Sequence, residues 1–134
     1  MIRRMDHFTI VTDRLAATLD FYGILGLDEG PRPDFGFPGA WLYVADSPVL
    51  HIVETDRMPD PRRGALDHMA FFAEDLVGTA QRITAASVDY RIIRAPRPFS
   101  RWQMFLFDPN GVEVELDFIS EETPPADWRS RAGG

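Results

Sequence analysis

The sequence predicts a single α+β domain in which two βαβββ modules form a curved, incompletely closed mixed sheet with helices on its outer face. Three observations support this: an internal repeat, one apolar face on each expected strand, and a length of 134 residues, which suits one hydrophobic core. The domain is expected over residues 1–120, with modules at 5–54 and 66–119, a linker at 55–65 and a flexible tail at 121–134.

The first part of the repeat is a strand followed by a helix. Residues 6–15 align with residues 67–76 at an offset of 61, and each copy opens with Asp-His. Apolar residues then follow at helical spacing, at Leu15, Leu19 and Tyr22 in one copy and at Leu76, Ala80 and Ile83 in the other.

The ends of the expected helices also carry typical residues. A helix start is indicated by the polar residues before each helix, which are Thr12 or Asp13 in the first copy and Glu74 or Asp75 in the second. A helix end is indicated by Gly26.

The second part of the repeat predicts a strand, a tight turn and another strand. Residues 41–52 align with residues 105–116 at an offset of 64. The turn in the second copy is Asp108-Pro109-Asn110-Gly111, whose residue types favour a tight reversal. The polar, proline-containing linker and the proline-rich segment after Ser120 predict loop and unstructured chain.

Composition excludes several classes of function. The net charge of -7 gives no reason to expect nucleic acid or an anionic membrane surface as a partner. The absence of cysteine excludes disulfides, zinc fingers, iron–sulfur clusters and thiol catalysis. No apolar run approaches the ~20 residues of a membrane span, and no signal peptide is recognisable, so a cytoplasmic protein is expected.

Alternation along the strands predicts that all three histidines share the concave face of the sheet. The repeat pairs His7 with His68 and His51 with Glu115, so a pseudo-twofold relation between the modules would bring four potential ligands to one point. Neutral imidazole and carboxylate suit one divalent ion. Fe²⁺ is the first choice, with Mn²⁺, Ni²⁺, Co²⁺ or Zn²⁺ as alternatives.

Two other glutamates could act as ligands in place of Glu115. Glu113 shares a face with Glu115 and is its main rival, although register against His51 favours Glu115. Glu54 points with the apolar residues of its strand and is interpreted as a solvated charge at the strand end.

The sequence resembles the vicinal oxygen chelate superfamily, which includes glyoxalase I, extradiol dioxygenases, fosfomycin-resistance transferases and bleomycin-binding proteins. The resemblance covers residues 5 to about 119 and is carried by four segments: Asp6–Val11, Phe21–Leu27, Asp67–Phe71 and Phe107–Leu116. It implies a glyoxalase-like fold, metal ligands at His7, His68 and Glu115, and an extra ligand at His51. It also implies a homodimer and a small substrate whose neighbouring oxygens both bind the metal, which acts as a Lewis acid.

Several residues are candidates for substrate contact. Trp41 and Tyr43 share a strand face expected to open onto the concavity, and Trp102 lies in a flanking loop, where aromatic lining suits a small aromatic substrate or plain core packing. Arg101 would hold an anionic group, with surface solvation as the alternative. Thr9 matches a position that fosfomycin-resistance relatives use.

The reaction depends on His51. Oxygen-activating iron sites use two histidines and one carboxylate, so a non-coordinating His51 that acts as an acid–base residue favours a dioxygenase, our first choice. A coordinating His51 favours a glyoxalase-type isomerase or lyase, in which Glu115 would move the substrate proton. The non-enzymatic alternative is a protein that sequesters a drug or metabolite, like the bleomycin resistance proteins.

Overall fold

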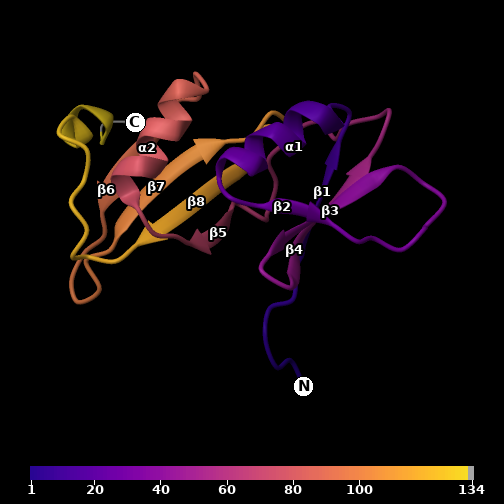
Figure 1. Cartoon of the computed structure of the whole chain (residues 1–134), viewed down its shortest axis with the longest axis horizontal. Coiled ribbons are helices and arrows are strands. Elements are labelled where there is room, and N and C mark those ends of the chain that lie inside the picture. Colours follow the sequence, from indigo (N-terminus) through magenta and orange to yellow (C-terminus); the bar gives the residue numbers. More distant parts are fainter. Residues whose placement is uncertain (133–134) are drawn as a thin grey trace. The chain divides into compact units, whose positions relative to one another are not determined.

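The computed structural model describes residues 1–132 of the chain. The chain forms two compact units, the first covering residues 1–62 and the second beginning at Arg63, so the break falls inside the predicted linker. Each unit contains one helix between strands and one mixed sheet of four strands (Figure 1).

The first unit contains a sheet whose strands lie in the order β1-β4-β3-β2. β1 and β4 are parallel, whereas β3 is antiparallel to both of its neighbours. The elements are β1 (Phe8–Thr12), α1 (Leu15–Ile24), β2 (Asp28–Gly30), β3 (Gly39–Val44) and β4 (Ser47–Glu54).

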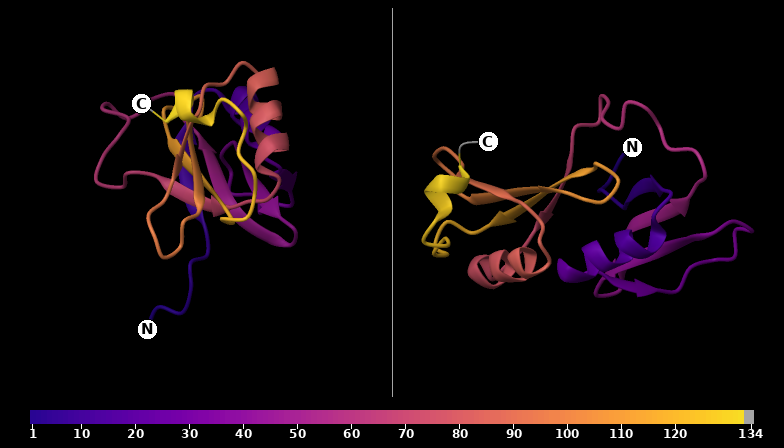
Figure 2. Two further views of the ribbon diagram at one scale, coloured as in Figure 1. Left: turned by 90° about the vertical axis from the view of Figure 1, so that its left-hand side faces the viewer. Right: turned by 90° about the horizontal axis from the view of Figure 1, so that it is seen from above.

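The second unit repeats this topology, with the strand order β5-β8-β7-β6 and a parallel β5–β8 pair. Helix α2 runs along one face of its sheet (Figure 2). The elements are β5 (Met69–Phe72), α2 (Leu76–Ala85), β6 (Arg91–Arg94), β7 (Trp102–Phe107), β8 (Glu113–Phe118) and a short 3-10 helix η1 (Trp128–Arg131).

The strand registers reproduce both offsets of the sequence repeat. His51 lies between Thr9 of β1 and Trp41 of β3, and Glu115 lies between Ala70 of β5 and Phe105 of β7. His51 and Glu115 therefore occupy equivalent positions in the two modules. The predicted fold class, α+β with two βαβββ modules, is confirmed.

Alternation along the strands separates a buried apolar face from a more polar one. In the first unit the buried residues include Phe21 and Tyr22 of α1 and Leu50 and Ile52 of β4. In the second unit they include Leu76, Ala80 and Ile83 of α2 and Ile92, Met104, Leu106, Val114, Leu116 and Phe118 of the sheet. The histidine and glutamate candidates lie between these apolar positions, as a period of two requires.

Side chains before the helices and in the tight turn satisfy backbone groups. The Asp75 carboxylate accepts a hydrogen bond of 3.0 Å from the Gly78 amide at the start of α2. In the first unit Thr12 Oγ1 accepts from the Arg14 amide at 2.9 Å. In the predicted turn Asp108 Oδ1 accepts from the Asn110 and Val112 amides, and Gly111 has a φ of 82°.

Side chains of the C-terminal segment make contacts within the second unit. Trp102 Nε1 donates to the Glu122 carbonyl at 2.9 Å, and the rings of Trp102 and Trp128 meet edge to face at 4.9 Å. The Arg131 guanidinium lies 4.2 Å from the centre of the Tyr90 ring. These contacts order the segment up to residue 132, while residues 133 and 134 lie outside the described residues.

No helix within residues 1–132 combines the length and the apolar character needed to cross a membrane.

Candidate metal centre

The first unit stacks His7, His51 and Trp41 in one column. The His7 and His51 rings are 3.7 Å apart with an interplanar angle of 16°, and the His51 and Trp41 rings are 4.0 Å apart with an angle of 8°. The β4 strand supplies the central ring, β3 supplies the indole, and His7 directly precedes β1. Stacking on both faces restricts the His51 ring to a narrow range of orientations.

His51 has the character of a neutral imidazole. Its Nε2 atom is buried and has no hydrogen-bond partner among the described residues. Burial, followed by the proximity of His7, holds the pKa of His51 below its ordinary value. An unpartnered nitrogen with a free lone pair is what a divalent ion requires of a histidine ligand.

The second unit brings His68 and Glu115 into direct contact. His68 Nε2 lies 2.7 Å from Glu115 Oε2. Gln103 Nε2 donates to Glu115 Oε1 at 2.5 Å and to Asp117 Oδ1 at 3.3 Å. The β8 strand places Glu115 and Asp117 on one face, and Gln103 of β7 lies beside them.

The protonation of this pair follows from its surroundings. Burial, reinforced by the neighbouring Asp117, raises the pKa of Glu115, although His68 and Gln103 oppose the shift. The hydrogen bond to Asp67, together with the charge of Glu115, raises the pKa of His68. Both shifts favour the protonated form of each group, so a metal ion would compete with protons for His68 Nε2 and the Glu115 carboxylate.

An aspartate orients the histidine at the start of each module. Asp6 Oδ2 lies 2.6 Å from His7 Nδ1, and Asp67 Oδ2 lies 2.7 Å from His68 Nδ1. These hydrogen bonds are the main reason that the pKa of both aspartates is lowered. When Nδ1–H donates to a carboxylate, the lone pair lies on Nε2, as is usual for metal-binding histidines. Sequence reasoning gave these aspartates no role, although Asp precedes His at the repeat offset in both copies.

Glu113, the rival ligand, is engaged elsewhere. Its side chain is 5% exposed, and Arg63 and Arg91 contact its two oxygens at 2.6 Å and 3.2 Å. The cations neutralise this buried carboxylate, whereas Glu115 has no arginine partner in the described part of the chain. The contacts therefore support the choice of Glu115.

The candidates for substrate contact in the first unit differ in how far other residues of the chain already engage their side chains. Thr9 is exposed and lies beside His51 in the parallel β1–β4 pair. Trp41 covers one face of His51. The Tyr43 hydroxyl already donates to the Pro31 carbonyl at 2.5 Å, so its polar end holds the β2–β3 connection.

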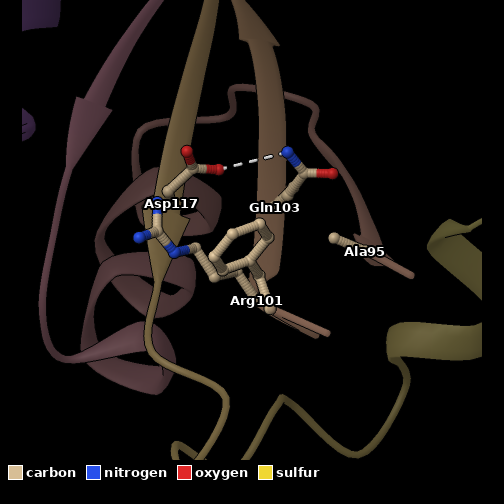
Figure 3. A pocket seen from close by; sticks show the side chains of 5 residues that line it. Ala95, Arg101, Gln103 and Asp117 are labelled. Carbon is tan, nitrogen blue, oxygen red and sulfur yellow. Dashed lines mark hydrogen bonds between the residues drawn. The ribbon is translucent and has the colours of Figure 1, made fainter. Parts of the chain in front are cut away.

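In the second unit Arg101 lines a pocket of about 210 Å³ with Ala95, Phe99, Gln103 and Asp117 (Figure 3). Its guanidinium lies 5.2 Å from the Phe72 ring centre and 5.8 Å from that of Phe99. Gln103 joins this pocket to Glu115 through its hydrogen bond. Trp102 instead alternates with Gln103 along β7 and is 4% exposed, so it packs on the opposite, buried face.

Each unit supplies half of the predicted ligand set, with His7 and His51 in the first and His68 and Glu115 in the second. Within residues 1–132 no group of three or more His, Asp or Glu side chains is gathered in the way a metal requires, so neither unit forms a complete site by itself. The types of side chain nevertheless suit a divalent ion. Aspartates orient two of the imidazoles, His51 has an unpartnered ring nitrogen among the described residues, and Glu115 is a buried carboxylate.

Comparison with solved structures shows the same fold. A Listeria monocytogenes fosfomycin resistance protein, FosX, matches with a TM-score of 0.68 and 20% identity, covering 88% of this chain and 94% of that one. A Nostoc punctiforme glyoxalase/dioxygenase matches with a TM-score of 0.71 and 20% identity, covering 89% and 92%. A Bacillus anthracis structure described under the glyoxalase family reaches 0.73 with 19% identity, covering 89% and 97%.

Sequence comparison gives the same assignment. Curated protein sequences gave no match. The family model for the Glyoxalase/Bleomycin resistance protein/Dioxygenase superfamily matches residues 4–116, which is most of the chain. The chain therefore belongs to the Glyoxalase/Bleomycin resistance protein/Dioxygenase superfamily.

Proposed function

We propose that this chain is a divalent-metal-dependent enzyme that binds a small substrate through two neighbouring oxygens. The observation that carries the proposal is the duplicated arrangement of the histidines. In each module an aspartate fixes Nδ1 of the first histidine, and the equivalent position of the central strand carries His51 or Glu115. We propose that His7, His68 and Glu115 hold one ion, with Fe²⁺ as the first choice. His51 then serves either as a fourth ligand or as an acid–base residue.

A bound metal would act as a Lewis acid toward the two substrate oxygens. The residues of the chain then bind and orient the substrate and carry protons. Glu115, whose pKa is raised, and His51, whose pKa is lowered, are the proposed acid–base groups. Trp41 and Thr9 lie beside His51 and are proposed to contact the substrate there. Arg101, which shares a pocket with Gln103, would hold an anionic group of the substrate.

Two reactions are compatible with this set. A dioxygenase, our first choice, needs His51 to stay off the metal as an acid–base residue. A glyoxalase-type isomerase or lyase is favoured if His51 is the fourth ligand, and its buried, unpartnered Nε2 supports that second candidate. The solved structures of the same fold include both a glyoxalase/dioxygenase and a fosfomycin resistance protein.

Anaerobic metal analysis with spectroscopy of the Fe²⁺ and Co²⁺ forms tests the proposal. Three protein ligands and a charge-transfer band on adding a catechol would support the dioxygenase. Four protein ligands and a reaction indifferent to oxygen would support the isomerase or lyase. Failure to bind any divalent ion, with normal small-molecule binding by His7→Ala, would replace both with a drug- or metabolite-binding protein. Gel filtration tests the expected homodimer.

A further inference from the structure

Arg63 joins two carboxylates in the second unit. Its Nη2 atom lies 2.6 Å from Glu113 Oε2 and 2.5 Å from Asp67 Oδ1, and its Nε lies 3.0 Å from the same Asp67 oxygen. The residue comes from the segment between the modules, for which sequence reasoning predicted only a linker. Two nitrogens of the planar guanidinium converge on one Asp67 oxygen, which leaves the other Asp67 oxygen for His68.

Glu113 provides the anchor for this arginine. Its side chain is 5% exposed, whereas Arg63 and Asp67 are 50% and 59% exposed. A second cation, Arg91, contacts the other oxygen of Glu113 and stacks 4.1 Å from the centre of the Phe105 ring. Glu113 of β8 is buried and is contacted by Arg91 of β6 as well as by Arg63, so it is a fixed point to which the Arg63 side chain is attached.

Asp67 transmits this anchoring to His68. One Asp67 oxygen accepts from Arg63, and the other lies 2.7 Å from His68 Nδ1. On the opposite side of the ring, Nε2 lies 2.7 Å from Glu115. Two carboxylates therefore compete for the single proton of a neutral His68. Only the form with the proton on Nδ1, facing Asp67, leaves Nε2 free for a metal.

The first module has no equivalent of the Arg63–Glu113 pair. At the repeat offsets, Ile2 stands where Arg63 would be and Val49 stands where Glu113 would be. Among residues 1–132 no arginine is hydrogen-bonded to Asp6, whose contact is with His7. In the first module Asp6 contacts His7 without an arginine from the described part of the chain, so this contact does not itself require one. The role of Arg63 must therefore depend on a feature that only the second module has. That feature is the Glu115 carboxylate beside His68 Nε2.

We infer that Arg63 is a positioning residue that holds Asp67 against His68 Nδ1 and so keeps Nε2 open toward the ligand set. The inference rests on the proposed function only for its consequence for metal affinity. The position of the proton on the His68 ring is a property of the apoprotein and can be measured without any metal.

The test uses Arg63→Met in the full-length apoprotein, with Arg57→Met, an exposed arginine of the same linker, as the matched control. ¹⁵N–¹H correlation spectra of the histidine rings, recorded well above the ordinary histidine pKa, report which nitrogen carries the proton. We expect the Nδ1–H form at His68 in the unaltered protein and in Arg57→Met. In Arg63→Met we expect a shift toward the Nε2–H form, with His7 unchanged.

The alternative is that Arg63 only neutralises charge. Its loss would then leave Asp67 more negative and the Nδ1–H form of His68 unchanged or more populated, which would overturn the inference. Glu113→Gln provides a second variant if Arg63→Met does not fold, and it should move His68 in the same direction. Arg63→Lys keeps the charge without the planar fork and should restore the Nδ1–H form only in part.

Co²⁺ titration adds the consequence for the metal. Contacts behind a ligating histidine change metal affinity by about 10–100-fold, so Arg63→Met should weaken Co²⁺ binding at least about tenfold, and Arg57→Met should not. Equal affinity of Arg63→Met and the unaltered protein would overturn the inference. If the unaltered protein binds no Co²⁺, the proposed function fails, while the ring spectra still decide the role of Arg63.

Discussion

Replacing Asp67 by Asn removes the negative charge behind His68 and preserves the shape of the side chain. The Asn oxygen can still accept from His68 Nδ1 across the 2.7 Å that the carboxylate now spans. What is lost is the ionic character of that hydrogen bond, which makes the imidazole a stronger ligand. The variant therefore separates charge from geometry at one half of the proposed metal centre.

The structure allows an estimate of the size of the effect. Contacts of this kind change metal affinity by about 10–100-fold, or about 1.4–2.7 kcal/mol. Arg63 already neutralises much of the Asp67 charge through two hydrogen bonds to one oxygen. Asp6 is hydrogen-bonded to His7 without such an arginine. We therefore expect a loss of about tenfold for Asp67→Asn and a larger loss, toward 100-fold, for Asp6→Asn.

Titration of the apoprotein with Co²⁺ across a series of pH values is the assay. Asp67 is the main reason that the pKa of His68 is raised, and a protonated histidine cannot bind a metal. Asp67→Asn should therefore lower that pKa, so the Co²⁺ affinity should begin to fall at a lower pH than in the unaltered protein, even though the affinity at alkaline pH is weaker. Asp56→Asn, an exposed carboxylate of the linker, is the control. Unchanged affinity at alkaline pH, or an affinity that begins to fall at a higher pH, would refute the reasoning.

Three further predictions concern the surroundings of the ligands and the C-terminal segment. Trp41→Ala removes the indole stacked on His51 and should lower the free energy of unfolding, measured in urea, by at least about 0.5–1.5 kcal/mol. Trp41→Phe should retain most of the stability of the unaltered protein. Equal stabilities of all three proteins would contradict the stacking. Asp117→Asn removes the charge that helps to raise the pKa of Glu115, so half-loading with Co²⁺ should move to lower pH, and a move upward would count against this assignment. Trp128→Ala should destabilise the protein by about 1 kcal/mol, whereas no change in urea unfolding would restore the prediction of a flexible tail.

The repeat and the alternation of apolar residues were enough to predict the two modules, the sequence of elements within each module and the strand faces that carry His51 and Glu115. A strand has a period of two, so one buried position determines the direction of every other side chain on it. Ile52 is buried, so His51 lies on the other face of β4. In the same way Glu115 lies on the face of β8 opposite Val114 and Leu116. The offset of 64 makes His51 and Glu115 equivalent positions on the evidence of the sequence alone.

Features that depend on loops and on single long side chains could not be predicted in this way. Nothing in the linker sequence indicates that Arg63 reaches a glutamate fifty residues further on, because no periodicity constrains a loop. Trp102 was assigned to a loop, but β7 begins there, and alternation with Met104 places it on the buried face. The prolines after Ser120 suggested unstructured chain, whereas the burial of Trp102 against Trp128 outweighs that local preference.

The central claim is that one divalent ion is shared by ligands from both modules. Co²⁺ binding to the unaltered protein, His7→Ala and His68→Ala tests it most directly, with folding of each variant checked by circular dichroism. We predict one Co²⁺ per chain in the unaltered protein and loss of that same site in both variants. Normal Co²⁺ affinity in His7→Ala, with binding lost only in His68→Ala, would contradict a shared centre.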